Sequence, residues 1–285
     1  MIVITGATGQ LGRLVIDALL KKVPANKLVA AMRDIEKAND IAALGVTVRY
    51  ADYNQPESWD AALKGAEKVL LISSSEVGQR TQQHQTVIDA AKRAGINLLA
   101  YTSILHADTS TLMLAQEHQA TEAAILASGL PYAILRNGWY TENYTQGIPA
   151  ALSQGAVNGC ADQGRVSSAS RQDYANAAAE VLSGEHHAGK VYELAGDDAF
   201  TMAEFAAAIT KLSGQAIQYI NLSEQDYKNA LIGAGLPEAF ARLLADADKG
   251  VAKGQLFDDS RQLSQLIGMP TTTLVSVVRN ALEAI

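Results

Sequence analysis

One short segment near the start restricts the fold more than any other part of this 285-residue chain. A strand-like apolar run, residues 2–5, leads directly into TGATGQLG, which places Gly6, Gly9 and Gly12 at three-residue intervals. Behind them, apolar residues recur with the spacing of one helix face: Leu11, Leu14, Val15, Ala18 and Leu19. Strand, glycine turn and amphipathic helix in this order predict the phosphate-binding turn of a dinucleotide fold.

Each glycine of this turn has a separate physical role. Gly6 permits the sharp turn from strand to helix, Gly9 lets the backbone approach a pyrophosphate, and Gly12 lets the helix pack close to the strand. The phosphates would then lie on the amide N–H groups at the positive end of the helix. A glycine-rich turn without any ligand is the alternative.

The first half of the chain alternates short apolar runs with amphipathic segments. We expect strands at residues 2–5, 28–32, 46–50, 69–73, 98–102 and 132–136. We expect helices at residues 79–94 and 115–128, each followed by a glycine suited to end it, Gly95 and Gly129. This alternation predicts an α/β Rossmann fold, a doubly wound parallel sheet.

The rhythm changes after Gly138, where a segment rich in glycine and tyrosine reads as an excursion from the sheet. We therefore expect a NAD(P)-binding Rossmann domain over residues 1–138. Residues 139–285 would form mainly a smaller C-terminal α/β substrate lobe, with some segments returning to the first domain. In this second part we expect a strand at 191–196, a capping box at Thr201 and Glu204, a strand within 215–221 and a mainly helical end.

The end of the second strand indicates which dinucleotide is bound. Selectivity for NAD usually uses an acidic residue there, whereas a 2′-phosphate favours a guanidinium. The strand runs out into Met32 and Arg33, and Arg13 on the first turn of the helix adds a second positive charge. We therefore expect NADPH, with NADH as a weaker cofactor. In the alternative, Arg33 is a solvated residue and Asp34 binds the ribose.

Two further segments follow strands at the carboxyl edge of the sheet, where cofactors lie in doubly wound folds. Ser73, Ser74 and Ser75 offer space and hydroxyl groups to the ribose or phosphates. In the segment NGWYTE, residues 137–142, Trp139 and Tyr140 could border a flat ring. An ordinary polar loop and a pair of packing aromatics are the respective alternatives.

Charge and cysteine content narrow the partners and the compartment. The formal net charge is −7, so neither nucleic acid nor an anionic membrane surface is expected as a partner. Cys160 is the only cysteine, which excludes an intrachain disulfide and favours a reducing compartment, and we expect it to be a buried, inert thiol. Without a signal-like or membrane-spanning segment, the expected location is the cytoplasm.

Four segments together resemble the NmrA-like family of atypical short-chain dehydrogenases, and within it the bacterial NAD(P)H:quinone oxidoreductases of type 2 and triphenylmethane reductase. They are ITGATGQLG, LLISSSEVGQR, LRNGWYTENY and LFDDSRQLSQLIGMPTTTL, which extend over essentially the whole chain. The resemblance implies NADPH bound between a Rossmann domain and a small lobe, and two-electron reduction of a quinone. It also implies these cofactor contacts: Gly6, Ala7, Thr8, Gly9, Gln10, Leu11, Arg33, Ser73, Ser74, Ser75, Asn137, Gly138, Trp139, Tyr140, Thr141 and Glu142.

One departure from short-chain dehydrogenases that act on alcohols and ketones affects the chemistry. Those enzymes use Tyr-x-x-x-Lys, in which the lysine lowers the pKa of the tyrosine, but here Leu105 stands four residues after Tyr101. A quinone accepts hydride directly, so we assign no catalytic acid or base. His106 and His118 are possible proton donors. His118 and Glu122 have the spacing of two metal ligands, but no third ligand is evident, and no metal is expected.

Two alternatives to a quinone oxidoreductase stay open. The first is a redox sensor that binds dinucleotide without turnover, as some NmrA-like proteins do. The second is a reductase of a dye or another conjugated acceptor. The sequence indicates neither the physiological quinone nor the oligomeric state.

Overall fold

The computed structural model describes all 285 residues, and the chain divides into two compact units. Unit 1 comprises Met1–Ala107, Glu117–Asn137 and Arg171–Tyr192. Unit 2 comprises Asp108–Gln116, Gly138–Ser170 and Glu193–Ile285. The chain therefore passes between the units several times. The short segment Asp108–Gln116 belongs to unit 2, although the sequence did not indicate that this segment leaves the first domain.

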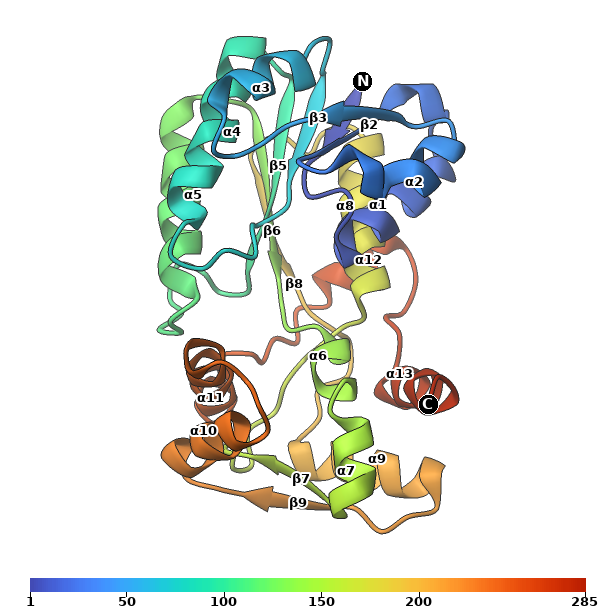
Figure 1. Cartoon of the computed structure of the whole chain (residues 1–285), viewed down its shortest axis with the longest axis vertical. Coiled ribbons are helices and arrows are strands. Elements are labelled where there is room, and N and C mark those ends of the chain that lie inside the picture. The colour runs from blue at the N-terminus through green and yellow to red at the C-terminus, as the bar shows by residue number, and fades with distance from the viewer. The chain divides into compact units, whose positions relative to one another are not determined.

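A seven-stranded sheet forms the centre of unit 1, in the order β3-β2-β1-β4-β5-β6-β8 (Figure 1). Its strands are β1 (Ile2–Ile4), β2 (Leu28–Met32), β3 (Thr47–Tyr50), β4 (Lys68–Leu71), β5 (Leu98–Ile104), β6 (Tyr132–Asn137) and β8 (Lys190–Leu194). The first six pair in parallel, and β8 lies at the edge beside β6. The Rossmann-type fold and its strands, predicted from the apolar runs, are confirmed.

Helices cover both faces of this sheet, with α1 and α8 on one side and α4 and α5 on the other (Figure 1). The helices of unit 1 are α1 (Gln10–Leu20), α2 (Asn39–Ala43), α3 (Pro56–Ala62), α4 (Arg80–Ala94), α5 (Ala115–Ser128) and α8 (Arg171–Ser183), with 3₁₀ turns at Ala25–Lys27 and Ile35–Ala38. Because both faces are covered, every residue of β1, β2 and β5 is buried. One core cluster includes Val3, Val29, Trp59, Leu71 and Leu99.

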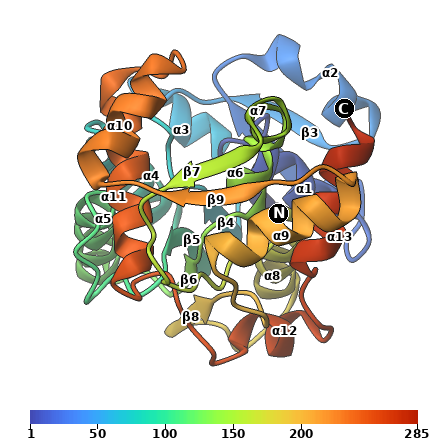
Figure 2. The same ribbon diagram turned by 90° about the horizontal axis from the view of Figure 1, so that it is seen from below.

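Unit 2 contains a two-stranded parallel sheet of β7 (Ala156–Gly159) and β9 (Gln218–Asn221), which lie side by side in Figure 2. Its helices are α6 (Thr141–Thr145), α7 (Ile148–Gln154), α9 (Met202–Ser213), α10 (Glu224–Gly233), α11 (Glu238–Ala252), α12 (Gln262–Ile267) and α13 (Leu274–Glu283). The predicted capping box is present at the start of α9, where Thr201 and Glu204 bond reciprocally. None of the helices in either unit has the length and apolar character that a membrane span requires.

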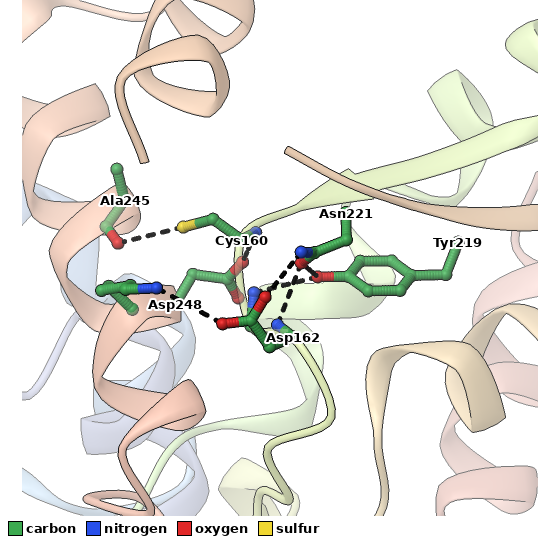
Figure 3. Close-up of polar contacts among 8 residues, drawn as sticks. Cys160, Asp162, Tyr219, Asn221, Ala245 and Asp248 are labelled. Carbon is green, nitrogen blue, oxygen red and sulfur yellow. Dashed lines mark hydrogen bonds and ion pairs between the residues drawn. The ribbon is translucent and has the colours of Figure 1, made fainter. Parts of the chain in front are cut away.

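A buried polar cluster joins the end of β7 to α11 inside unit 2 (Figure 3). The Asp248 carboxylate accepts the backbone N–H of Cys160, and the Cys160 thiol donates to Ala245 O at 3.5 Å. Burial raises the pKa of Cys160 to about 12, so this thiol stays protonated and unreactive, as predicted. Burial also raises the pKa of Asp248 to about 6, because the carboxylate loses water and its hydrogen bonds from Cys160 offset only part of that loss.

Candidate functional site

The turn after β1 has the conformation that the glycine pattern predicts. Gly6 adopts a φ of +57°, in the left-handed region where a side chain is strained, and its carbonyl accepts the Gly9 N–H at 2.9 Å. The Thr5 hydroxyl accepts the Ile72 N–H at 3.0 Å, which ties this turn to the segment that follows β4. Two carboxyl-edge segments are thus fixed to each other.

Gly12 allows the first turn of α1 to touch the loop in front of it. A Cβ placed on Gly12 would lie 2.5 Å from Gly6 O and 2.8 Å from Ala7 Cα, both backbone atoms that cannot swing aside. No larger residue fits here unless the helix moves. The close contact fixes the start of α1 against the loop.

The N-terminus of α1 is prepared for an anion. No side chain caps this helix and no acidic residue lies in its first turn. Its opening N–H groups have no acceptor within the helix, and they carry the positive end of its dipole. Gly9 and Gln10 are exposed there, whereas Leu11 packs inward. A phosphate is the group that this arrangement fits best.

Arg33 lies just beyond β2 and is exposed. Its guanidinium is 3.7 Å from a carboxylate oxygen of Glu76, on the segment after β4. Asp34, the alternative ribose ligand, instead pairs with Lys37 at 3.3 Å. The end of β2 therefore presents a guanidinium toward the carboxyl edge of the sheet.

Arg13 does not add the second positive charge that we expected from its place on α1. Its guanidinium pairs with the Asp40 carboxylate and donates to Lys37 O at 2.9 Å and to Thr8 O at 3.2 Å. These contacts neutralise the charge and hold the side chain against the Ile35–Ala38 turn and α2. The sequence could not reveal this because Asp40 lies 27 residues further along the chain.

The three serines after β4 differ in what they present. Ser74 is buried and fully engaged: its N–H donates to His84 Nε2 at 3.0 Å, its hydroxyl donates to Gln83 Oε1, and its carbonyl accepts Arg80 Nε at 2.5 Å. Ser75 is exposed and Ser73 is half-buried. The hydroxyls of Ser73 and Ser75 are therefore better placed for a ligand than that of Ser74.

A set of buried polar residues beneath this loop escaped the sequence analysis. His84 accepts the Ser74 N–H on Nε2, and its other ring nitrogen, Nδ1, lies 2.9 Å from Thr121 Oγ1. The Thr121 hydroxyl donates in turn to Glu117 O at 2.8 Å. The Glu117 carboxylate accepts the N–H groups of Gly78 and Arg80, each at 3.1 Å. The loop before α4 is thus fastened from α4 and α5.

Tyr101 is a packing residue, as its incomplete motif indicates. It is fully buried on β5, and its hydroxyl lies 2.7 Å from His118 Nδ1. Burial raises the pKa of Tyr101 above its ordinary value. Burial, together with the charge of Arg80, lowers the pKa of His118 to about 3. His118 is therefore a neutral core residue bonded to Tyr101, which does not suit it to donate a proton to a substrate.

Glu122 likewise bonds to other side chains of the protein. It forms a nearly buried ion pair with Arg136, with N···O distances of 3.0 and 2.8 Å, and accepts Ser103 Oγ at 2.5 Å. His118 bonds to Tyr101, so these two side chains do not act together as a ligand pair. The i, i+4 spacing on α5 arises from two separate core contacts.

Asn137 ends β6 at the carboxyl edge of the sheet in unit 1. Its backbone carbonyl accepts the Leu105 N–H at 2.9 Å. Its side-chain Oδ1 is buried, yet it has no hydrogen-bond partner within the protein. Such a buried acceptor is costly unless a ligand or water supplies a donor. Asn137 is therefore the one predicted site residue with a buried side-chain polar atom that has no hydrogen-bond partner in the protein.

The remaining predicted residues, from Gly138 to Glu142, belong to unit 2. Their backbone runs beside Ala169, which accepts the Thr141 N–H at 2.9 Å and donates to Trp139 O at 3.1 Å. Thr141 is buried and its hydroxyl lies 2.8 Å from Ser168 Oγ. Trp139 and Tyr140 are half-buried.

The features of unit 1 fit a dinucleotide with a 2′-phosphate. An uncapped helix N-terminus meets the charge of a diphosphate, the contact at Gly12 holds that N-terminus in place, and Arg33 supplies a guanidinium at the end of β2. Asn137 Oδ1 offers an unsatisfied acceptor at the same edge of the sheet. NADPH has the groups that these residues need.

Comparison of this chain with known protein families and solved structures agrees with this geometry. The NmrA-like family matches residues 1–278. Quinone oxidoreductase 2 of Escherichia coli (strain K12) is 57% identical over 278 residues, 98% of this chain and 97% of that protein. The crystal structure of an Escherichia coli NADPH-dependent quinone oxidoreductase complexed with NADPH superposes with a TM-score of 0.97 at 56% identity, over 99% of this chain and 100% of that one.

A second solved structure is nearly as similar. Citrobacter sp. triphenylmethane reductase complexed with NADP(H) superposes with a TM-score of 0.95 at 41% identity, over 99% of this chain and 100% of that one. The family match covers almost the full length, and the sequence resemblance rested on segments spread over that same length. This chain therefore belongs to the NmrA-like family.

Proposed function

We propose that this protein is an NADPH-dependent quinone oxidoreductase that reduces a small quinone by two electrons. The observation that carries the proposal is the start of α1, uncapped and pressed against the turn by Gly12, with Arg33 at the end of the neighbouring strand. The 57% identity to quinone oxidoreductase 2 of Escherichia coli, over nearly the whole chain, supports the quinone as substrate.

NADPH, when bound, supplies the hydride, and solvent supplies the proton that completes the hydroquinone. The residues of unit 1 bind and orient: the amides at Gly9 to Leu11 hold the diphosphate, and Arg33 holds the 2′-phosphate. Ser73, Ser75 and Asn137 would contribute further polar contacts. Ser74 supports its neighbours, because its own polar groups are already bonded within the protein.

No residue of unit 1 is assigned to proton transfer in this reaction. Tyr101 is buried against His118 and lacks the lysine that would activate it. Reduction of a quinone suits such a site because the quinone has a high electron affinity and accepts hydride directly. The protein then has mainly to orient the nicotinamide and quinone rings and to exclude water. In unit 2, Gly138 to Glu142 remain proposed contacts, with Trp139 and Tyr140 bordering a flat ring.

The proposal is tested by following the loss of reduced-nicotinamide absorbance when the protein is mixed with NADPH and a benzoquinone or naphthoquinone. The expected result is oxidation well above the uncatalysed background. Arg33→Ala should raise the KM for NADPH far more than the KM for NADH. Equal changes in the two KM values would show that Arg33 does not bind the 2′-phosphate. No turnover with any quinone would reject the enzymatic proposal.

Reduction of a cationic triphenylmethane dye is a second candidate, favoured by the 41% identity to triphenylmethane reductase. Decolorisation of a dye at a higher kcat/KM than any quinone would favour it. Tight binding of NADP⁺ and NADPH without turnover of either acceptor would instead favour a redox sensor. Activity in the cytoplasm and the absence of a nucleic-acid partner stay predictions from the sequence.

A further inference from the structure

Glu76 is the only residue with which the exposed Arg33 guanidinium makes an ion pair, and it belongs to a different segment of the sheet edge. The distance between Arg33 NH1 and Glu76 Oε1 is 3.7 Å, too long for a hydrogen bond. The contact therefore balances charge without holding the arginine in one geometry. The two side chains are about 65% and 47% exposed, so the pair contributes little to folding stability.

The Glu76 carboxylate, in contrast, is held firmly. Gln83, which is only 3% exposed, donates from Nε2 to Glu76 Oε2 at 2.8 Å. The same glutamine accepts the Ser74 hydroxyl on its Oε1, and that hydroxyl also accepts the Glu76 N–H at 3.2 Å. One buried glutamine thus uses both ends of its amide to fix a surface carboxylate beside Arg33.

The charge of Glu76 also affects Tyr53, a residue of unit 1. Burial raises the pKa of Tyr53, whose hydroxyl bonds to Thr5 in the turn after β1, and the negative charge of Glu76 raises it further. Glu76 follows β4 and pairs with Arg33 after β2, so the carboxylate lies at the same carboxyl ends of the strands as the glycine turn after β1. A second anion placed on Arg33 would share the guanidinium with Glu76 and be repelled by it.

We propose that Glu76, fixed by Gln83, is a specificity-determining residue that weakens the preference of this protein for 2′-phosphorylated nucleotides. The inference rests on the proposed function, because it requires that Arg33 meet the 2′-phosphate. Glu76 pairs with Arg33 when the nucleotide is absent and opposes the 2′-phosphate when it is present. A fixed counter-charge of this kind permits some use of NADH and hastens release of NADP⁺.

The substitution Glu76→Gln tests this reasoning with little change of shape, because a glutamine can still accept from Gln83. The probes are 2′,5′-ADP and 5′-AMP, which differ at the 2′-phosphate, and the measurement is calorimetric binding to the full-length protein. We expect Glu76→Gln to tighten 2′,5′-ADP about three- to tenfold, as for one charge several ångströms from a phosphate in a mostly solvated setting. The affinity for 5′-AMP should change less than about twofold.

A matched control is Glu185→Gln, because Glu185 is exposed and influences Lys68, the first residue of β4, at the amino ends of the strands and away from Arg33. It removes the same charge and should leave both affinities unchanged. The gain at Glu76 should also shrink in 0.5 M salt, where the screening length falls to about 4 Å.

The outcomes separate this inference from the proposed function. Equal changes for both probes, or weaker binding of 2′,5′-ADP by Glu76→Gln, would overturn the role of Glu76 while leaving the quinone oxidoreductase proposal intact. If the unaltered protein bound neither probe nor NADPH, the proposed function would fail and the inference would fail with it. A larger gain at Glu76 than at Glu185, confined to 2′,5′-ADP, supports it.

Discussion

Replacing Gly12 by alanine should weaken the binding of NADPH while the protein still folds. The new Cβ would lie 2.5 Å from Gly6 O, whereas ordinary contact begins near 3.4 Å, so the start of α1 must move by about 0.9 Å. A hydrogen bond of about 2.9 Å stretched by that amount exceeds the range of a hydrogen bond. The amides that open α1 would therefore lose their contact with the diphosphate.

The size of the effect follows from those bonds. Each hydrogen bond to a charged group contributes about 1.5–3 kcal/mol, and 1.4 kcal/mol corresponds to a tenfold change in Kd. Loss of one or two such bonds should raise the Kd for NADPH by about 10- to 100-fold or more. Gly9→Ala should have a milder steric effect on the turn itself, since its Cβ would lie 3.2 Å from Gly6 O.

Isothermal titration calorimetry with NADPH measures the change, and circular dichroism with thermal unfolding checks that each variant is folded. The control is Gly233→Ala in α10, where an added Cβ meets no atom within 4 Å, so its Kd should equal that of the unaltered protein. A folded Gly12→Ala protein that bound NADPH with unchanged Kd would refute the reasoning. It would mean that the N-terminus of α1 does not hold the diphosphate.

Three further predictions concern stability. The folded-state pKa values of His84 and His118 are lowered to about 3, so their contribution is present above pH 6.5 and is lost as the pH falls. At pH 5 each should cost about 2 kcal/mol relative to pH 7, seen in urea unfolding followed by fluorescence, and a flat profile would contradict it. Glu122→Ala should destabilise the protein by about 3–5 kcal/mol because it removes the carboxylate from the buried Arg136, while Glu122→Gln costs less in the same assay. The pKa of Asp248 is raised to about 6, so stability should fall as the pH rises from about 4 to about 6. Asp248→Asn should remove this fall and gain up to about 3 kcal/mol above pH 6.5 in thermal unfolding; an equal loss at all pH values would exclude titration of Asp248.

The sequence predicted the sheet of unit 1 because its central strands are buried on both faces and read as short apolar runs. It also predicted the glycine turn, whose function depends on local backbone geometry at Gly6 and Gly12. It missed α8 (Arg171–Ser183), where the buried face consists largely of alanine and gives a weak hydrophobic period. It missed β7 (Ala156–Gly159) because three half-buried residues and a buried glycine carry almost no pattern.

The supporting residues of the candidate site were harder to find. Gln83 and His84 lie in RTQQHQTVIDAAKRA, a segment that reads as a solvated helix, yet both are buried. Their burial depends on Ser74, Glu76 and Thr121, which only the tertiary fold brings to them. Local periodicity carries no information about such long-range partners, and the same limit applies to the buried contact between His118 and Tyr101.

A crystal structure of the protein soaked with NADPH tests the central claim most directly. We expect diphosphate oxygens within hydrogen-bonding distance of the amides of Gln10 and Leu11, and the 2′-phosphate against Arg33. Density for the diphosphate away from the start of α1, or no bound nucleotide at saturating NADPH, would contradict the account.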